Sequence, residues 1–166
     1  MSKKTALLSL NQKKYLIGYN FLLAIGWFAF LLMSIGHFFE LKPINLWLLN
    51  ICQLAALLEI MHVALGWVRS SIWITTVQVG SRIAVLIMIN ILYLSAISYG
   101  KQGFVFISIA WGITEIVRYS YYTTHLINYS SQILQWLRYN LFIILYPLGI
   151  LGELLVIYVF LYKKMY

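Results

Sequence analysis

The chain has 166 residues, of which 63% are hydrophobic and only 10% are charged, and its mean hydropathy is +0.86. Soluble domains are about half apolar and about a quarter charged, so this composition excludes an ordinary soluble domain and indicates a membrane protein. The net charge of +8 does not indicate nucleic-acid binding, because the lysines flank apolar segments instead of forming a basic patch. The single cysteine, Cys52, excludes an intramolecular disulfide and a multi-cysteine zinc site.

Five apolar segments are long enough to cross a bilayer, which takes about 20 residues each. They cover residues 15–35, 44–66, 72–98, 104–122 and 139–162. The first segment is too long for the core of a signal peptide, and no small-residue cleavage site follows it, so we expect it to be retained. The mixed sequence at 123–137 predicts a short helix in the membrane interface. The predicted fold class is an all-α polytopic transmembrane helix bundle, with residues 1–166 forming a single membrane domain.

The distribution of lysines predicts the orientation in the membrane. Four lysines precede the first span and predict a cytosolic N-terminus. With five spans, Lys163 and Lys164 would then lie on the opposite side, against the positive-inside rule. Either a sixth span is missing from this chain or one of the five segments does not cross the membrane.

Charged residues inside the spans are the strongest functional signal. Three of the four acidic residues, Glu59, Glu115 and Glu153, fall inside predicted spans. An ionised side chain at the centre of a bilayer costs about 2.5–3.5 kcal/mol, so we expect these carboxylates to face the bundle interior and to pair with arginines. All the arginines lie in or beside a span, on or near the predicted cytosolic side: Arg69, Arg82, Arg118 and Arg138.

Spacing along the predicted helices places several polar residues on shared faces. The pairs are Glu59 with His62, Gln78 with Arg82, and Glu115 with Arg118, and Tyr122 follows a further turn on. One interpretation is a structural polar network that holds the helices together. Another is a site open to the cytosol for a phosphate-bearing ligand with an apolar tail, such as an acyl-CoA. No histidine pair has the spacing of metal ligands, so we expect no metal site.

The last span contains the sequence "IILYPLGILGELL" at 143–155, which is unusual for a lipid-facing helix. Tyr146 and Glu153 differ by about 20° around a helix and by about 10.5 Å along it, so they share a face and could bracket a small reacting group. Pro147 predicts a bend, and Gly149 and Gly152 leave room for close helix packing or for a substrate. A proton donor and a carboxylate suit an acid–base elimination. The alternative is a proline kink with Glu153 paired to an arginine.

Four stretches carry a resemblance to a known family: "LLEIMHVALGWVRSS" (57–71), "TVQVGSR" (76–82), "WGITEIVRYSYY" (111–122) and "LRYNLFIILYPLGILGE" (137–153). In order and spacing they resemble the very-long-chain (3R)-3-hydroxyacyl-CoA dehydratases, also called protein-tyrosine-phosphatase-like membrane proteins. The resemblance implies an endoplasmic reticulum enzyme of fatty acid elongation. Such an enzyme removes water from a (3R)-3-hydroxyacyl-CoA to give the trans-2-enoyl-CoA. The resemblance also implies that the other elongation enzymes are partners and that no cofactor is needed, because dehydration is redox-neutral.

The resemblance implies that Tyr146 and Glu153 are the catalytic pair, without saying which is the base. Further motif residues would bind substrate or support the site: Glu59, Gln78, Arg82, Glu115, Arg118, Arg138 and Gly149. The arginines among them would hold the phosphates of CoA or brace the carboxylates. A cysteine-phosphatase chemistry is excluded, because its loop needs an arginine six residues after the cysteine and Leu58 stands there.

The family usually has six spans, whereas five are visible in this chain. A catalytically inactive lipid-binding or scaffolding membrane protein of the same fold is therefore the alternative function.

Overall fold

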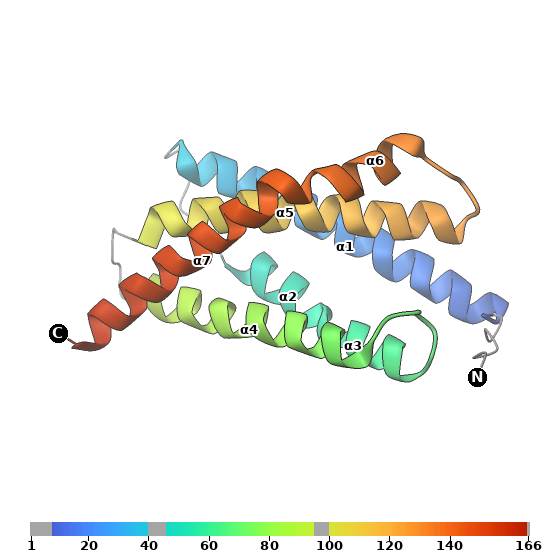
Figure 1. Ribbon diagram of the computed structural model, residues 1–166, viewed down its shortest axis with the longest axis horizontal. Coiled ribbons are helices and arrows are strands. Elements are labelled where there is room, and N and C mark those ends of the chain that lie inside the picture. Colours follow the sequence, from blue (N-terminus) through green and yellow to red (C-terminus); the bar gives the residue numbers. More distant parts are fainter. Residues whose placement is uncertain (1–7, 40–45, 95–99, 166) are drawn as a thin grey trace.

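The computed structural model describes residues 8–39, 46–94 and 100–165, and every regular element in these ranges is an α-helix. The prediction of an all-α bundle is therefore confirmed (Figure 1). In chain order the helices are α1 (Leu10–Phe38), α2 (Trp47–Ala55), α3 (Leu57–Ala64), α4 (Ile72–Leu94), α5 (Gly100–Leu126), α6 (Gln132–Asn140) and α7 (Phe142–Met165). The start of the second predicted span, at 44–45, and the end of the third, at 95–98, lie outside the described residues.

Four of these helical segments are long and apolar enough to cross a membrane: α1, α2 together with α3, α4 and α7. Helix α5 corresponds to the fourth predicted span and is long enough, with 27 residues. Its mean hydropathy nevertheless keeps it out of these four candidates, because Glu115 and Arg118 interrupt its apolar sequence. The chain is thus a multi-pass helical membrane protein, and α5 is the long helix in which Glu115 and Arg118 lie one turn apart.

Helix α5 is the centre of the bundle. It packs extensively against α1 and α7, which do not contact each other within the described residues, so α5 lies between them. The shared core consists of large side chains that are almost fully buried, among them Trp27 and Phe30 of α1, Ile107 and Trp111 of α5, and Val156 of α7. Figure 1 shows α4 on the other side of the bundle from α6, with α2 and α3 beside it. Helix α4 packs mainly on α2, α3 and α7 and contacts α5 little.

Helices α5 and α7 approach each other so closely that only glycine fits at one position. A Cβ atom added to Gly152 would lie 2.9 Å from both the carbonyl oxygen of Gly103 and the backbone nitrogen of Ile107. A Cβ atom at Gly149 would only meet the Cβ of Ala110 at 3.4 Å, an ordinary contact. Of the two uses predicted for these glycines, close helix packing is the one that Gly152 serves. This contact holds the next residue of α7, Glu153, close to α5.

The second predicted span consists of two short helices that meet at Ala56. The break places Glu59 in the first turn of α3, where the free N–H groups and the helix dipole favour a carboxylate. The carbonyl of Ala55, at the end of α2, accepts a hydrogen bond of 3.0 Å from the Tyr19 hydroxyl. No glycine or proline marks this break in the sequence, so the hydropathy pattern does not reveal it.

The short helix predicted between the fourth and fifth spans is confirmed with shifted ends. Helix α5 continues to Leu126, and the short helix is α6, whose first turn is capped by the Ser131 hydroxyl. None of the residues of α6 is buried. Helix α6 therefore lies on the outside of the bundle and connects α5 to α7.

Candidate active site

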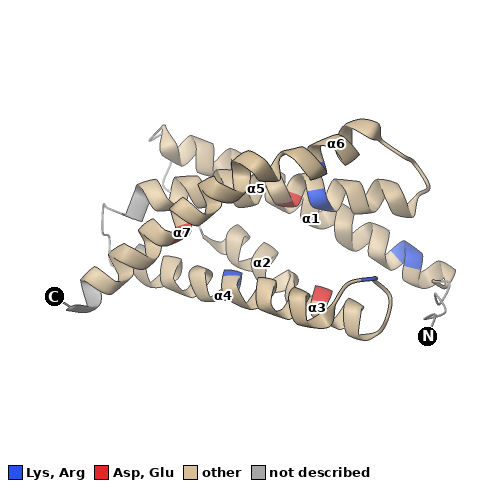
Figure 2. Ribbon diagram, viewed as in Figure 1, with Lys and Arg blue, Asp and Glu red and all other residues tan. Residues whose placement is uncertain are grey.

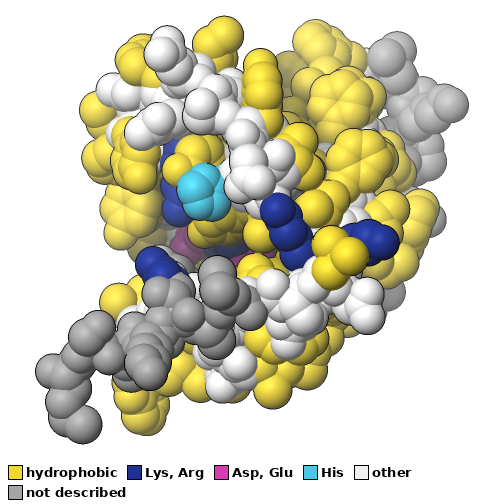
Figure 3. All heavy atoms as spheres, turned by 90° about the vertical axis from the view of Figure 1, so that its right-hand side faces the viewer, with side chains coloured by type: hydrophobic (Ala, Val, Ile, Leu, Met, Phe, Trp, Pro, Cys, Tyr) yellow, Lys and Arg dark blue, Asp and Glu magenta, His cyan; other side chains and the backbone are white. Residues whose placement is uncertain are grey.

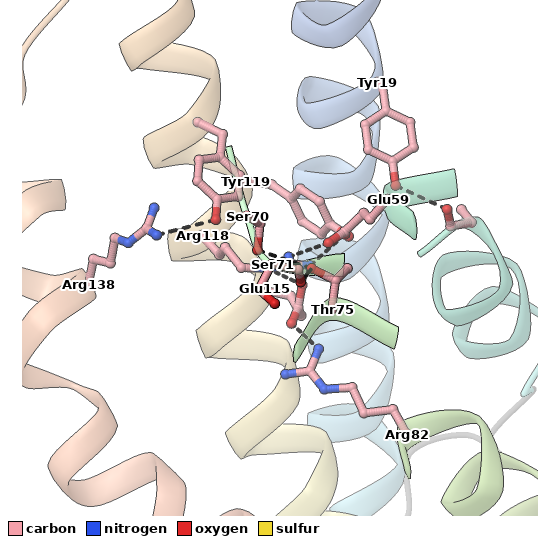
Figure 4. Close-up of polar contacts among 12 residues, drawn as sticks. Tyr19, Glu59, Ser70, Ser71, Thr75, Arg82, Glu115, Arg118, Tyr119 and Arg138 are labelled. Carbon is pink, nitrogen blue, oxygen red and sulfur yellow. Dashed lines mark hydrogen bonds and ion pairs between the residues drawn. The ribbon is translucent and has the colours of Figure 1, made fainter. Parts of the chain in front are cut away.

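Three helices bring four charged residues together into what we term the ion cluster: Glu59 of α3, Arg82 of α4, and Glu115 and Arg118 of α5 (Figure 4). Arg118 Nη1 and Nη2 donate to Glu59 Oε2 and Oε1 at 2.6 and 2.7 Å. Arg118 Nε donates to Glu115 Oε2 at 2.9 Å. Arg82 Nη1 pairs with the other oxygen of Glu115. The expectation that these carboxylates face the interior and pair with arginines is confirmed for Glu59 and Glu115.

The ion cluster is electrically balanced and well hydrogen-bonded. Two guanidinium groups face two carboxylates, and every carboxylate oxygen accepts at least one hydrogen bond. The Glu115 side chain is 1% exposed, and the Glu59 side chain is 17% exposed. Charges are tolerated in a low-dielectric interior only when they are paired and hydrogen-bonded in this way. Figure 3 shows one end of the molecule, where basic side chains border a depression with acidic side chains at its bottom.

Two of the predicted spacings do not produce pairs. His62 Nε2 lies 3.1 Å from the Tyr15 hydroxyl, and its ring stacks on that of Trp67. No ion pair or hydrogen bond between described residues joins it to Glu59. The side chain of Gln78 is exposed on α4 and is not part of the ion cluster, although Arg82 one turn later is. Helical spacing identifies residues that share a face, and the packing of neighbouring helices decides which of them meet a partner.

Glu153 lies on α7, which also carries Tyr146, and is connected to the ion cluster through α5. Figure 2 shows acidic residues on α3, α5 and α7 and basic residues on α4 and α5 between them. The Trp111 Nε1–H donates to Glu153 Oε1 at 3.1 Å. The guanidinium carbon of Arg82 lies over the Trp111 ring, 5.7 Å from its centroid. Trp111 therefore stands between the ion cluster and Glu153. Among the described residues Glu153 has no ion pair, so the alternative of an arginine partner is wrong.

Tyr146 precedes Glu153 by two helical turns on α7, which continues through Pro147. Its side chain is 67% exposed. No residue in the described part of the chain hydrogen-bonds its hydroxyl group. The structure thus holds one member of the predicted pair through Trp111 and leaves the other with an uncommitted hydroxyl.

Arg138 lies on α6, outside the ion cluster, and lines a hollow in the surface of the bundle. Its Nη2 donates to the Tyr122 hydroxyl at 3.2 Å, and its guanidinium carbon lies 4.5 and 4.7 Å from the ring centroids of Tyr121 and Tyr122. The hollow beside it has a volume of about 200 Å³. It lies between α5, α6 and the start of α7 and is lined by Thr114, Val117, Arg118, Leu137, Arg138, Leu141 and Phe142. Arg118 is the one residue that touches both this hollow and the ion cluster.

Several residues of the site were not singled out from the sequence. The Tyr119 hydroxyl donates to Glu59 Oε1, and Trp111 holds Glu153. Both stand in the motif "WGITEIVRYSYY", four residues after and four residues before Glu115, and hence on its face of the helix. Extending the helical face in both directions would have found them. Tyr19, which bonds Ala55, carries no such signal.

The fold and the site define a helical membrane protein with a buried, neutral ion cluster linked to a carboxylate on a neighbouring helix. A profile of the family "Protein tyrosine phosphatase-like protein, PTPLA" matches residues 53–165, and the chain belongs to this family. The matched range includes the ion cluster, Trp111, Tyr146 and Glu153.

Curated relatives extend the similarity over most of the chain. Very-long-chain (3R)-3-hydroxyacyl-CoA dehydratase 2 of Mus musculus is 39% identical over 150 residues, which are 87% of this chain and 58% of that protein. The corresponding protein named hpo-8 in Caenorhabditis elegans is 35% identical over 159 residues, 90% of this chain and 71% of that protein. The chain thus spans little more than half the length of the mouse relative. No solved structure gives a significant match.

Proposed function

We propose that this protein dehydrates long- or very-long-chain (3R)-3-hydroxyacyl-CoA to the trans-2-enoyl-CoA, as a hydro-lyase of the fatty acid elongation cycle. The names of its curated relatives support this reaction. The observation that carries the proposal is the hydrogen bond from Trp111 to Glu153. It holds a carboxylate beside the buried ion cluster, on the same helix and the same face as Tyr146.

In the proposed mechanism Glu153 is the base and Tyr146 the acid. The carboxylate takes the proton from the carbon next to the thioester, the electron pair forms the new double bond, and the hydroxyl at carbon 3 leaves. Tyr146 donates its proton to this hydroxyl, which departs as water, and the proton on Glu153 is then returned to Tyr146. Trp111 occupies Oε1 of Glu153, and no described residue donates to Oε2, which leaves that oxygen for the substrate proton.

The remaining site residues support this chemistry. Arg82 and Arg118 brace Glu59 and Glu115, which is one of the two roles proposed for the arginines from the sequence. Gly149 is buried on α7 between the two catalytic residues and keeps that turn of the helix free of a side chain. Gln78, exposed one turn from Arg82, is a candidate substrate contact.

The cellular setting follows from the same proposal. Other elongation enzymes make the substrate and consume the enoyl product, and they are the expected partners in the endoplasmic reticulum membrane. The four lysines near the start of the chain, Lys3, Lys4, Lys13 and Lys14, support a cytosolic N-terminus. No redox cofactor is required, because the oxidation state of the substrate does not change.

A second candidate function is a lipid-binding or scaffolding protein without catalysis. The exposure of Tyr146, at 67%, favours it, because a catalytic acid is expected to lie in an enclosed site.

The test is an assay of the full chain, purified in detergent, with a long-chain (3R)-3-hydroxyacyl-CoA. We expect trans-2-enoyl-CoA to form, as detected by mass spectrometry, with the (3S) isomer as a control that is not converted. Failure to convert the (3R) substrate would favour the scaffolding function.

A further inference from the structure

Arg138 differs from Arg82 and Arg118 in having no counter-charge among the residues that the structure describes. The ion pairs among the described residues involve only Arg82 and Arg118 on the basic side, and none reaches Arg138. The Nη1 atom of Arg138 is buried and has no hydrogen-bond partner. The other buried side-chain atoms without a partner in the described residues belong to the neutral groups of Trp27, Gln53 and Ser108. A charged donor buried without an acceptor is costly, so this position is suited to an anionic ligand.

The surroundings hold the Arg138 guanidinium in place. Its plane is packed against the rings of Tyr121 and Tyr122, and Nη2 is committed to the Tyr122 hydroxyl. Such stacking holds the planar guanidinium group in one orientation, and its N–H groups are the donors that bind phosphate and carboxylate groups. Figure 4 shows the Arg138 side chain to one side of the labelled residues of the ion cluster, and its printed hydrogen bond goes to the Tyr122 hydroxyl. Little side-chain entropy therefore remains to be lost when an anion binds to Nη1.

The hollow beside Arg138 has the size of a subsite. Its volume of about 200 Å³ is several times the ~30 Å³ share of one water molecule, so a phosphate group fits. It is smaller than the ~300–1,000 Å³ of pockets that enclose a whole ligand. Thr114 adds a hydroxyl, and Val117, Leu137 and Phe142 supply an apolar lining that strengthens an ionic contact by excluding water. The charge of Arg118 is balanced by its carboxylate partners, which leaves Arg138 as the cation of this hollow.

We propose that this hollow is a phosphate subsite in which Arg138 Nη1 donates to a phosphate oxygen of the CoA portion of the substrate. The identity of the phosphate donor rests on the proposed function, whereas the anion site itself rests on the geometry of Arg138. The structure divides the arginines that the sequence treated alike. Arg82 and Arg118 brace carboxylates, and Arg138 binds the ligand.

The test compares two thioesters of the same (3R)-3-hydroxy acid, one of CoA and one of pantetheine, which has no phosphate. In Arg138→Gln we expect the KM for the CoA thioester to rise about 10- to 100-fold, as the loss of one charge-assisted hydrogen bond implies. We expect kcat to change little and the pantetheine thioester to be used as well as by the wild type. Arg138→Lys keeps the positive charge but lacks the planar guanidinium group, so its KM for the CoA thioester should lie between those of the wild type and Arg138→Gln. The matched control is Arg69→Gln, which removes the same charge from an exposed position between α3 and α4 and should leave both substrates unaffected.

Three results would overturn the proposal. Equal losses with both thioesters would show that Arg138 is structural. A loss seen only in vesicles containing phosphatidylserine, and absent in neutral detergent, would show that a lipid phosphate occupies the hollow. If the chain does not dehydrate either thioester, binding of radiolabelled CoA decides the question separately from the reaction. Binding by the wild type that Arg138→Gln abolishes would support the subsite, and no binding by the wild type would refute it.

Discussion

The ion cluster and the α7 pair, Tyr146 and Glu153, use their polar groups in opposite ways. In the ion cluster every carboxylate oxygen has a donor within the protein. In the α7 pair, the described part of the chain supplies one donor to Glu153, from Trp111, and no partner to the Tyr146 hydroxyl. Groups whose hydrogen bonds are all made internally can hold helices together but offer nothing to a ligand. The comparison therefore supports a structural role for the ion cluster and supports the proposal that the chemistry takes place on α7.

The largest expected effect is on turnover when the α7 pair is altered. Glu153→Gln and Tyr146→Phe should each lower kcat by about 10²–10⁴-fold, the usual contribution of a general acid or base. The midpoint of thermal unfolding in detergent should stay close to that of the wild type, because neither group makes an ion pair in the described structure. Steady-state kinetics on the purified variants measures this, and undiminished turnover in both would remove the α7 pair from the mechanism.

Breaking the ion cluster should mainly affect stability. Arg118→Gln leaves Glu59 and Glu115 without their shared counter-charge, and we expect the free energy of unfolding to fall by about 3–5 kcal/mol. Denaturant unfolding in detergent measures the change, with the exposed Arg69→Gln as the control. A variant that stays as stable as the wild type yet loses turnover would instead place Arg118 in the chemistry, and the division between the two regions would fail.

The smallest expected effect lies at the residue that connects the two regions. Trp111→Phe keeps an aromatic ring but removes the N–H that holds Glu153, and we expect kcat to fall about tenfold, or about 1.4 kcal/mol, with KM unchanged. Trp27→Phe is the matched control, because Trp27 is also buried but no described residue accepts a hydrogen bond from its Nε1–H. A rise in KM together with a fall in kcat, or an equal loss in the control, would argue that Trp111 acts through packing alone.

Local spacing was sufficient for part of the site. Glu115 and Arg118 are three residues apart on one helix, and their hydrogen bond follows from that spacing. The pairing of Arg118 with Glu59 joins residues 59 positions apart in the sequence, and it depends on the position of α3 relative to α5 in the folded protein. The same holds for Trp111 and Glu153, which are 42 positions apart.

The hydropathy pattern located the helices but not their interruptions. The long apolar segments correspond to α1, α4, α5 and α7 because a bilayer requires uninterrupted apolar helices of about 20 residues. The break at Ala56 is accompanied by tertiary contacts, such as the hydrogen bond from the Tyr19 hydroxyl to the Ala55 carbonyl. The hydropathy pattern of the sequence does not predict such contacts. The sequence did not distinguish the roles of Arg118 and Arg138 either, since both are arginines near the predicted cytosolic ends of consecutive spans.

At Gly152 the main chain of α7 touches the main chain of α5 with no side chain between them. A side chain can rotate to relieve a displacement, whereas two backbones in contact cannot part slightly without leaving a void. We therefore expect helices α5 and α7 to move together, which would keep Glu115, Arg118 and Glu153 in a constant arrangement. If the proposed substrate enters between α4 and this helix pair, the Arg82–Glu115 ion pair is the contact that would have to break.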